Sequence, residues 1–188
     1  NRGVDKRNIF IDLRDLERFK ESILQFNQVD GIGSIQFQRK LSNSPVRALG
    51  SNKGKKTKPL VSMVAYCINP NHFHFILRQV VDGGIAKFMQ KLLAGYTYYF
   101  NQKQKRSGSL FQGTFKSKHI NKNEYLMYVY SYIHLNPAKL KNKEWKIQPN
   151  AFISDLKSFI SEYPYSSLQE YLSKKHVLID PKPFPITI

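Results

Sequence analysis

The sequence is short of cysteine, of long apolar runs and of acidic residues. Cys67 is its one cysteine in 188 residues, which excludes an internal disulfide and any cysteine-rich zinc site. No apolar run approaches membrane-spanning length, and no signal-peptide pattern opens the sequence. We therefore expect a cytoplasmic protein with no membrane partner.

The shortage of acids leaves a large positive charge. Lys and Arg number 30 against 13 Asp and Glu, for a formal net charge of +17. Residues 31–60 hold seven basic residues and no acid, and residues 101–150 hold ten against Glu124 and Glu144. A merely basic surface or an anionic-membrane binder would share this composition. No amphipathic basic helix stands out, so a nucleic acid is the favoured partner.

The hydrophobic and aromatic content, 41% and 13%, predicts one folded domain with a real core. Hydrophobic periodicity, capping residues and turn residues place helices and strands along the chain. We expect strands at 60–68 and 72–80, and helices from Leu13, at 85–102, at 124–135, at 151–160 and at 168–174. Asp12 and Asn123 are the expected caps of the first and third helices. The aromatic stripe of the 85–102 helix is expected to pack in the core.

Two stretches between these elements are less regular. A short strand is expected near 35–41, followed by an exposed basic loop over Ser51–Lys58. That loop is consistent with a solvated linker and equally with an arm that contacts phosphates. Residues 109–120 look extended, with Gly113 allowing a bend.

The turn Asn69–Asn71 leads into two histidines with one residue between them, His72 and His74. On a strand, alternate side chains share a face, so both imidazoles would stand side by side. Such a pair can bind a divalent ion and leave positions open for substrate. Taken alone, His-x-His more often marks two partly exposed histidines on a sheet.

Tyr125, Tyr128, Tyr132 and Asn136 recur at helical spacing on the expected third helix. Tyr132 and Asn136 are one turn apart, so a phenol and an amide oxygen could face one point. The spacing alone rather favours tyrosines that pack and an Asn136 that ends the helix before Pro137.

Several short motifs follow one another along the chain: NRGV and KRNIF within 1–10, NPNHFH at 69–74, LFQGTFK at 110–116, YIHLNP at 132–137 and YPYSS at 163–167. Motifs in this order resemble those of the REP-associated tyrosine transposases, bacterial members of the HUH single-strand transposases with one catalytic tyrosine. The similarity covers about residues 1–172.

The resemblance implies a ferredoxin-like α+β fold, an antiparallel sheet backed by helices, with a C-terminal helical extension. It implies a catalytic domain over 1–137 and an extension over 138–188 packing on it. Two features depart from the family pattern. The family's first strand, which precedes Asn-Arg-Gly, is missing from the chain shown, and residues 33–58 look longer than the usual connection.

By the same resemblance, His72, His74 and Asn136 are metal ligands and Tyr132 is the nucleophile. His134, two positions from Tyr132, would face away from it and have a structural role. The expected ion is Mg²⁺ or Mn²⁺, with no small-molecule cofactor. Imidazole ligands by themselves lean toward manganese or a later transition metal.

The implied activity is cleavage and rejoining of single-stranded DNA near hairpins through a 5′-phosphotyrosine, in the bacterial cytoplasm and associated with the nucleoid. Basic residues are expected to contact DNA phosphates, although each of them, taken singly, is more often an ordinary surface cation. These residues are Arg106, Lys116, Lys118 and Lys139. The protein would act as a monomer or a homodimer.

Two other functions remain open. A replication-initiator or relaxase nickase would share the metal and tyrosine chemistry, although the YIHLNP motif argues against it. A non-catalytic protein that recognises hairpin DNA, and acts on gene expression, is the other. The presence of all the expected catalytic residues makes that second alternative the weaker one.

Overall fold

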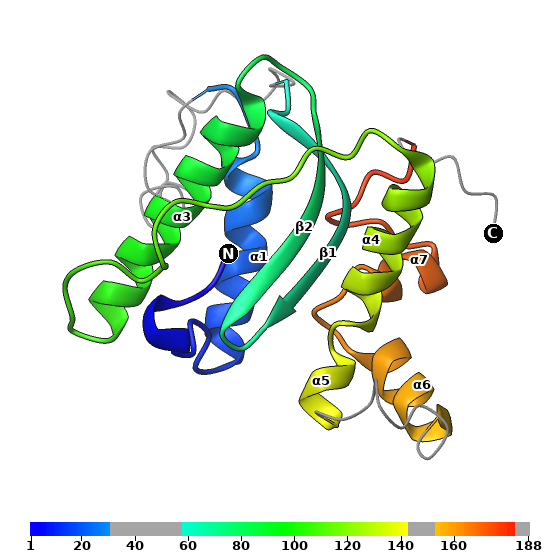
Figure 1. Ribbon diagram of the computed structural model, residues 1–188. Helices are drawn as coiled ribbons and strands as arrows, with labels where there is room; N and C mark the ends of the chain where they lie inside the picture. The colour runs from blue at the N-terminus through cyan, green and yellow to red at the C-terminus, as the bar shows by residue number, and fades with distance from the viewer. Residues whose placement is uncertain (31–57, 143–152, 183–188) are drawn as a thin grey trace, which may run out of the picture. The chain divides into compact units, whose positions relative to one another are not determined.

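Figure 1 shows a computed structural model of the chain, which describes residues 1–30, 58–142 and 153–182. Its elements are η1 (Val4–Lys6), α1 (Leu13–Phe26), β1 (Val61–Asn69), β2 (His72–Gln79), α3 (Gly84–Lys103), α4 (Asn123–Leu135), α5 (Ala138–Lys141), α6 (Ile153–Glu162) and α7 (Leu168–Ser173). The expected strand at 35–41, and nearly all of the basic loop at 51–58, lie outside the described residues. None of the helices in the described ranges is long and apolar enough to cross a bilayer.

β1 and β2 form an antiparallel pair joined by the tight turn at Pro70 and Asn71. Every residue of β1 is buried, whereas β2 mixes buried and partly exposed positions. The nearly continuous apolar run of β1 is what a strand covered on both faces requires. With its helices, the protein is an α+β fold built on an antiparallel sheet, as the sequence predicted.

The chain divides into two compact units, which we describe separately. The sheet unit consists of Asn1–Ile11, Met63–Arg78 and Ser109–Ile188. The helix-pair unit consists of Asp12–Ser62 and Gln79–Gly108. Residues 138–188 fall in the same unit as α4, and the expected domain boundary after residue 137 stays a prediction.

Within the sheet unit, short extended segments pair with both edges of the β1–β2 hairpin. Three isolated antiparallel bridges define them: Arg2 with His72, Gly3 with Phe111, and Cys67 with Ser166. Backbone hydrogen bonds support these pairings, among them Gln112 N to Arg2 O at 2.8 Å and Ile68 N to Tyr165 O at 2.9 Å. Strand edges are thus covered by parts of the chain that are far apart in sequence.

α4 packs on the sheet through Ile133, which joins a buried cluster of strand residues (Figure 1). The strand members of this cluster are Val64, Ala65, Cys67 and Ile76. The helix begins at Asn123, so the expectation that Asn123 caps it was wrong. Lys122 occupies the N-cap position and makes no side-chain capping bond.

The C-terminal part of the sheet unit is fastened to β1 by buried polar contacts. Ser167 Oγ lies 2.9 Å from Tyr66 N and 2.7 Å from His134 Nε2, so it links β1 to α4. The Glu170 carboxylate accepts from the Tyr66 hydroxyl at 2.9 Å and from the backbone N–H of Val177 at 2.6 Å. These contacts give the YPYSS segment and α7 a structural role.

In the helix-pair unit, α1 packs against α3. Asp12 caps α1 as predicted, because its side chain and that of Asp15 each accept the other's backbone N–H in a capping box. The Phe19 and Tyr96 rings meet edge to face at 4.9 Å. Phe26 fills the space over Gly95, where a Cβ would lie 2.5 Å from its ring. The aromatic stripe of α3 therefore packs in the core, as expected.

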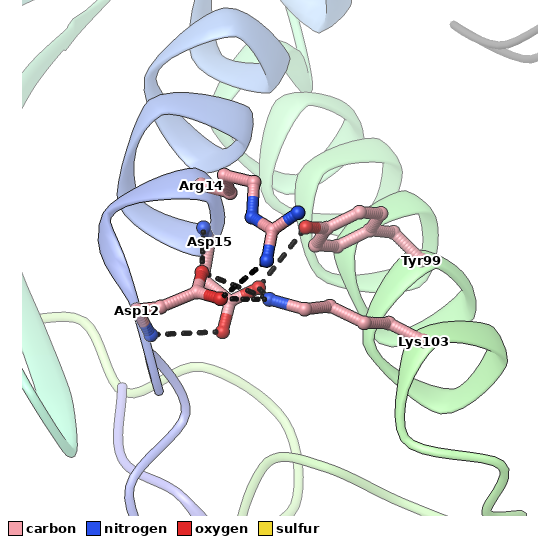
Figure 2. Close-up of polar contacts among 5 residues, drawn as sticks. All are labelled: Asp12, Arg14, Asp15, Tyr99 and Lys103. Atoms are coloured by element: carbon pink, nitrogen blue, oxygen red, sulfur yellow. Dashed lines mark hydrogen bonds and ion pairs between the residues drawn. The ribbon is translucent and has the colours of Figure 1, made fainter.

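An ion-pair cluster also joins these two helices (Figure 2). Lys103 Nζ lies 2.9 Å from both Asp12 carboxylate oxygens and 2.6 Å from Asp15 Oδ1. The Tyr99 hydroxyl donates to the same Asp15 oxygen at 3.0 Å. The fully buried Asp15 carboxylate is thereby compensated by one cation and hydrogen-bond donors.

Candidate metal and nucleophile site

The two histidines of the HFH motif lie on one face of β2. Their ring centroids are 5.1 Å apart and nearly perpendicular. Ile76, two residues further on the same face, belongs to the cluster that contacts α4. Phe73 lies on the opposite face and packs against Phe111 at 6.1 Å. Strand alternation therefore presents both imidazoles toward the side of the sheet that α4 covers.

The ring of His72 is oriented by two asparagines of the preceding turn. Its Nδ1 lies 2.6 Å from Asn71 Oδ1, an oxygen that can only accept, so Nδ1 carries the proton. Its Nε2 then has a free lone pair, which accepts from Asn69 Nδ2 at 3.2 Å. A carbonyl oxygen that fixes the tautomer of a histidine in this way is the usual second partner of a metal-binding imidazole.

Both imidazoles are held in the neutral form. Burial lowers the pKa of His72 to about 4, and the nearby positive charge of Arg2 acts in the same direction. Burial, followed by repulsion from His72, lowers the pKa of His74 to about 4. At neutral pH, both rings therefore offer lone pairs, which metal binding requires.

Asn136, at the C-terminal end of α4, is brought to the same place. Its side chain is 1% exposed, and its Oδ1 accepts a hydrogen bond from Asn69 Nδ2. As a hydrogen-bond acceptor beside the His72 ring, the Asn136 side chain also opposes the fall of that histidine's pKa. Asn136 Nδ2 is buried without a hydrogen-bond partner among the described residues. Unsatisfied buried groups of this kind are uncommon and need an explanation.

Tyr132 lies one helical turn before Asn136 and faces His74. The centroids of the two rings are 5.6 Å apart, in an edge-to-face arrangement. The Tyr132 side chain is partly buried against the core cluster. Lys139 extends its ammonium over the same ring, 5.3 Å from the centroid. The four residues that the sequence singled out are therefore neighbours in the structure.

The donor set suits a divalent cation. The lone pairs of His72 Nε2 and Asn136 Oδ1 both point at the N–H₂ group of Asn69, so these two acceptor atoms already face one electropositive group. The described residues contain no cluster of three His, Cys, Asp or Glu side chains that could hold a metal. An amide oxygen would therefore complete a site that begins with two imidazoles, and further positions would be left for substrate oxygens.

The other predicted residues fall in different places. His134 is buried, with Nε2 on Ser167 and its ring 4.2 Å from Tyr130, which fits the structural role predicted for it. Lys116 and Lys118 are exposed in the segment before α4. Arg106 belongs to the helix-pair unit, where its guanidinium donates to Asn101 Oδ1 at 2.8 Å.

Two residues of this site were missed by the sequence reasoning. Asn69 was treated as part of a turn, but its buried amide contacts both His72 and Asn136. Arg2 pairs by its backbone with His72 and brings a positive charge to the imidazoles. Their presence within the NPNHFH and NRGV motifs was the available signal, since neither position follows from periodicity.

No curated protein and no solved structure gave a match to the chain. A family model described as "Transposase IS200 like" matches residues 46–136, a stretch that contains both histidines, Tyr132 and Asn136. Over this stretch, which is just under half of its length, the chain is similar to the IS200-like transposases.

Proposed function

We propose that this protein is a metal-dependent transposase that cleaves and rejoins single-stranded DNA near hairpins through a 5′-phosphotyrosine on Tyr132. The observation that carries the proposal is the 5.6 Å between the ring centroids of Tyr132 and His74, in a site where His72 and Asn136 accept hydrogen bonds from one amide nitrogen. The REP-associated subgroup, suggested by the sequence motifs, is part of this proposal.

Tyr132 would act as the nucleophile. Its phenolic oxygen gives up its proton to water and attacks the phosphorus, the bond from phosphorus to the 3′ oxygen breaks, and the leaving oxygen takes a proton from water to become a free 3′-hydroxyl. The product is a 5′-phosphate ester of Tyr132, which conserves the energy of the broken bond. Attack by another 3′-hydroxyl releases the tyrosine and joins the strands without ATP.

The remaining residues would bind and orient the phosphodiester. A divalent ion held by His72, His74 and Asn136, Mg²⁺ or Mn²⁺, would supply positive charge that polarises the phosphate. Lys139, with its ammonium over the Tyr132 ring, would hold a phosphate oxygen beside the nucleophile. Alignment of phosphate and phenol by these groups turns the attack into an intramolecular step.

The substrate would be single-stranded at the reacting phosphate, because a phosphate in a duplex is hard to align with a tyrosine fixed on a helix. Palindromic hairpins with a short single-stranded flank are the class that the sequence resemblance suggests. The enzyme would work on such DNA in the bacterial cytoplasm, as a monomer or a homodimer.

The test is formation of a covalent adduct with a hairpin oligonucleotide derived from repeated palindromes that flank the gene. We expect a species resistant to denaturation with wild-type protein and Mg²⁺ or Mn²⁺, and its loss on addition of a chelator. Tyr132→Phe should bind the oligonucleotide but form no adduct. The fully duplex form of the same sequence, as the matched substrate control, should not react.

Two results would overturn the proposal. One is an undiminished adduct with Tyr132→Phe, which would mean that another residue is the nucleophile. The other is tight hairpin binding that a chelator leaves unchanged, with no cleavage of any hairpin substrate. That second result would support a protein that recognises hairpins without cutting them.

A further inference from the structure

One side of α4 carries an aromatic pair in which Tyr125 is partly exposed and Tyr128 is exposed. Tyr128 is 64% exposed, although its neighbours Leu126, Val129 and Tyr130 pack against the core cluster. The ring of Tyr125 stacks with that of Tyr128, with centroids 6.3 Å apart and planes inclined by 18°. Two nearly parallel rings on a helix surface present a broad flat face, and their exposure costs the fold apolar burial.

Free ammonium groups accompany this aromatic pair. Lys118 Nζ lies 4.5 Å above the Tyr125 ring, and Lys139 lies over Tyr132 at the other end of the stripe. Neither lysine forms an ion pair with a carboxylate in the described part of the chain. As far as the described residues go, both amines are therefore available to an anionic partner.

Tyr98 on α3 provides a comparison. It is 57% exposed, nearly as much as Tyr128. No ring or ammonium group from the described residues stacks on it. Exposure alone therefore does not single out the α4 face, whereas its paired rings and flanking amines do.

The stripe leads to the nucleophile. Tyr125, Tyr128 and Tyr132 occur at i, i+3 and i+7 on α4, so they follow one side of the helix. Seven residues of helix rise about 10 Å, which is about the length of three stacked nucleotides in one strand. A strand with its phosphate at Tyr132 would have bases within reach of the aromatic pair.

We infer that Tyr125 and Tyr128 form a base-stacking platform for the single strand next to the reacting phosphate, with Lys118 and Lys139 contacting its backbone. Aromatic rings beside cations are the usual means of holding single-stranded DNA without reading its sequence. The inference deepens the proposed function by adding a binding subsite. It depends on that function for the identity of the strand, but not for the act of binding.

The test measures binding in a Tyr132→Phe background, so that no cleavage intervenes. We would titrate a fluorescent hairpin oligonucleotide with a single-stranded flank, at fixed salt, and follow its anisotropy. Tyr128→Ala should weaken binding about tenfold, the size of one base–aromatic stack. Tyr128→Phe, which keeps the ring, and Tyr98→Ala, the matched exposed tyrosine, should stay within about twofold of the parent.

A second arm separates stacking from a general loss of structure. The flank is replaced by abasic nucleotides, which keep the phosphates but remove the bases. Tyr128→Ala and its parent should then bind equally, because there is nothing left to stack. Flanks with 5-iodouracil at single positions should photo-crosslink to Tyr125 or Tyr128, and fragmentation of the peptide containing residues 123–139 locates the crosslink.

Equal binding by the Tyr128→Ala and Tyr98→Ala proteins would overturn the inference. So would a Tyr128→Ala protein that binds DNA normally but no longer self-associates, since the α4 face would then belong to a second copy of the chain. Platform binding that persists while wild-type protein forms no phosphotyrosine adduct would count against the proposed function and not against the platform. A normal phosphotyrosine adduct, together with unchanged DNA binding by Tyr128→Ala, would overturn the platform and leave the proposed function standing.

Discussion

The two units each contain a cluster of polar side chains beside a tyrosine, and the clusters differ in how completely they are satisfied. In the helix-pair unit, the charges of Asp12 and Asp15 are balanced by Lys103, and Tyr99 donates to Asp15. In the sheet unit, the described part of the cluster consists of neutral imidazole and amide side chains without a carboxylate, and the buried Asn136 Nδ2 has no hydrogen-bond partner there. A balanced cluster stabilises a fold, whereas an unbalanced one is suited to bind something else.

The same substitution in both clusters should give opposite results. Tyr132→Phe should reduce adduct formation by more than about 1,000-fold, since the nucleophilic oxygen is gone, and should leave stability within about 0.5 kcal/mol. Tyr99→Phe should keep full adduct formation but lower the free energy of unfolding by about 1 kcal/mol, because it removes the hydrogen bond to Asp15. Denaturant titrations and adduct assays on both proteins check this.

A large loss of stability in Tyr132→Phe, or a large loss of adduct in Tyr99→Phe, would remove the distinction between the two clusters. The first outcome would make the Tyr132 hydroxyl a structural group. The second would connect the helix-pair unit to the chemistry.

Two imidazoles of the sheet unit, the partly buried His74 and the buried His134, sharpen the comparison. His74→Ala should weaken Mn²⁺ binding by about 100-fold, because one of three donors is lost. His134→Ala should leave Mn²⁺ affinity unchanged but destabilise the protein, since Ser167 loses its buried partner. Calorimetric Mn²⁺ titrations and thermal melts of the metal-free proteins measure the two effects. Equal Mn²⁺ affinities for the two variants would exclude His74 as a ligand.

Local spacing in the sequence was enough to place the side chains that share one element. The alternation of β2 put His72 and His74 together, and the helical period put Tyr132 and Asn136 on neighbouring turns. Periodicity also identified the core face of α3. These relations are fixed by backbone geometry within a few residues, so no knowledge of the tertiary structure is required.

Contacts between distant segments did not follow from spacing. The bridge from Arg2 to His72 and that from Cys67 to Ser166 depend on which strand edge each segment meets. The cap of α4 also differed from expectation, because Asn123 and Lys122 are both compatible with a helix start. Asn69 was missed for the same reason: its partner Asn136 lies 67 residues away.

In the cluster of the helix-pair unit, loss of the Lys103 cation should lower the stability of the protein and leave its activity unchanged. Lys103→Met should lower the free energy of unfolding by about 2 kcal/mol, because the buried Asp15 carboxylate loses its compensating charge. The cost stays below that of a fully buried pair, since the Lys103 side chain is 24% exposed. Lys87→Met, at an exposed position of the same helix, is the control and should change stability by less than about 0.5 kcal/mol. A smaller loss in Lys103→Met than in the control would contradict the role given to this cluster.

In the cluster of the sheet unit, loss of Asn71 and loss of Asn69 should change the Mn²⁺ affinity in opposite directions. Asn71→Ala removes the oxygen that fixes the His72 tautomer, so Mn²⁺ binding should weaken about tenfold. Asn69→Ala removes the N–H donors that satisfy His72 Nε2 and Asn136 Oδ1 in the metal-free protein. Two buried acceptors are then left unpaired, which should destabilise the metal-free protein by about 1 kcal/mol.

A bound cation would satisfy those two acceptors, so the penalty of Asn69→Ala falls on the metal-free state alone. By linkage, Mn²⁺ affinity should then rise, by about fivefold for a penalty of about 1 kcal/mol. Saturating Mn²⁺ should bring the thermal midpoint of Asn69→Ala close to that of the wild-type protein, and the gap should open again on chelation. A weaker Mn²⁺ affinity in Asn69→Ala would mean that Asn69 holds the ligands in place for the ion, and does not occupy the position that the ion would take.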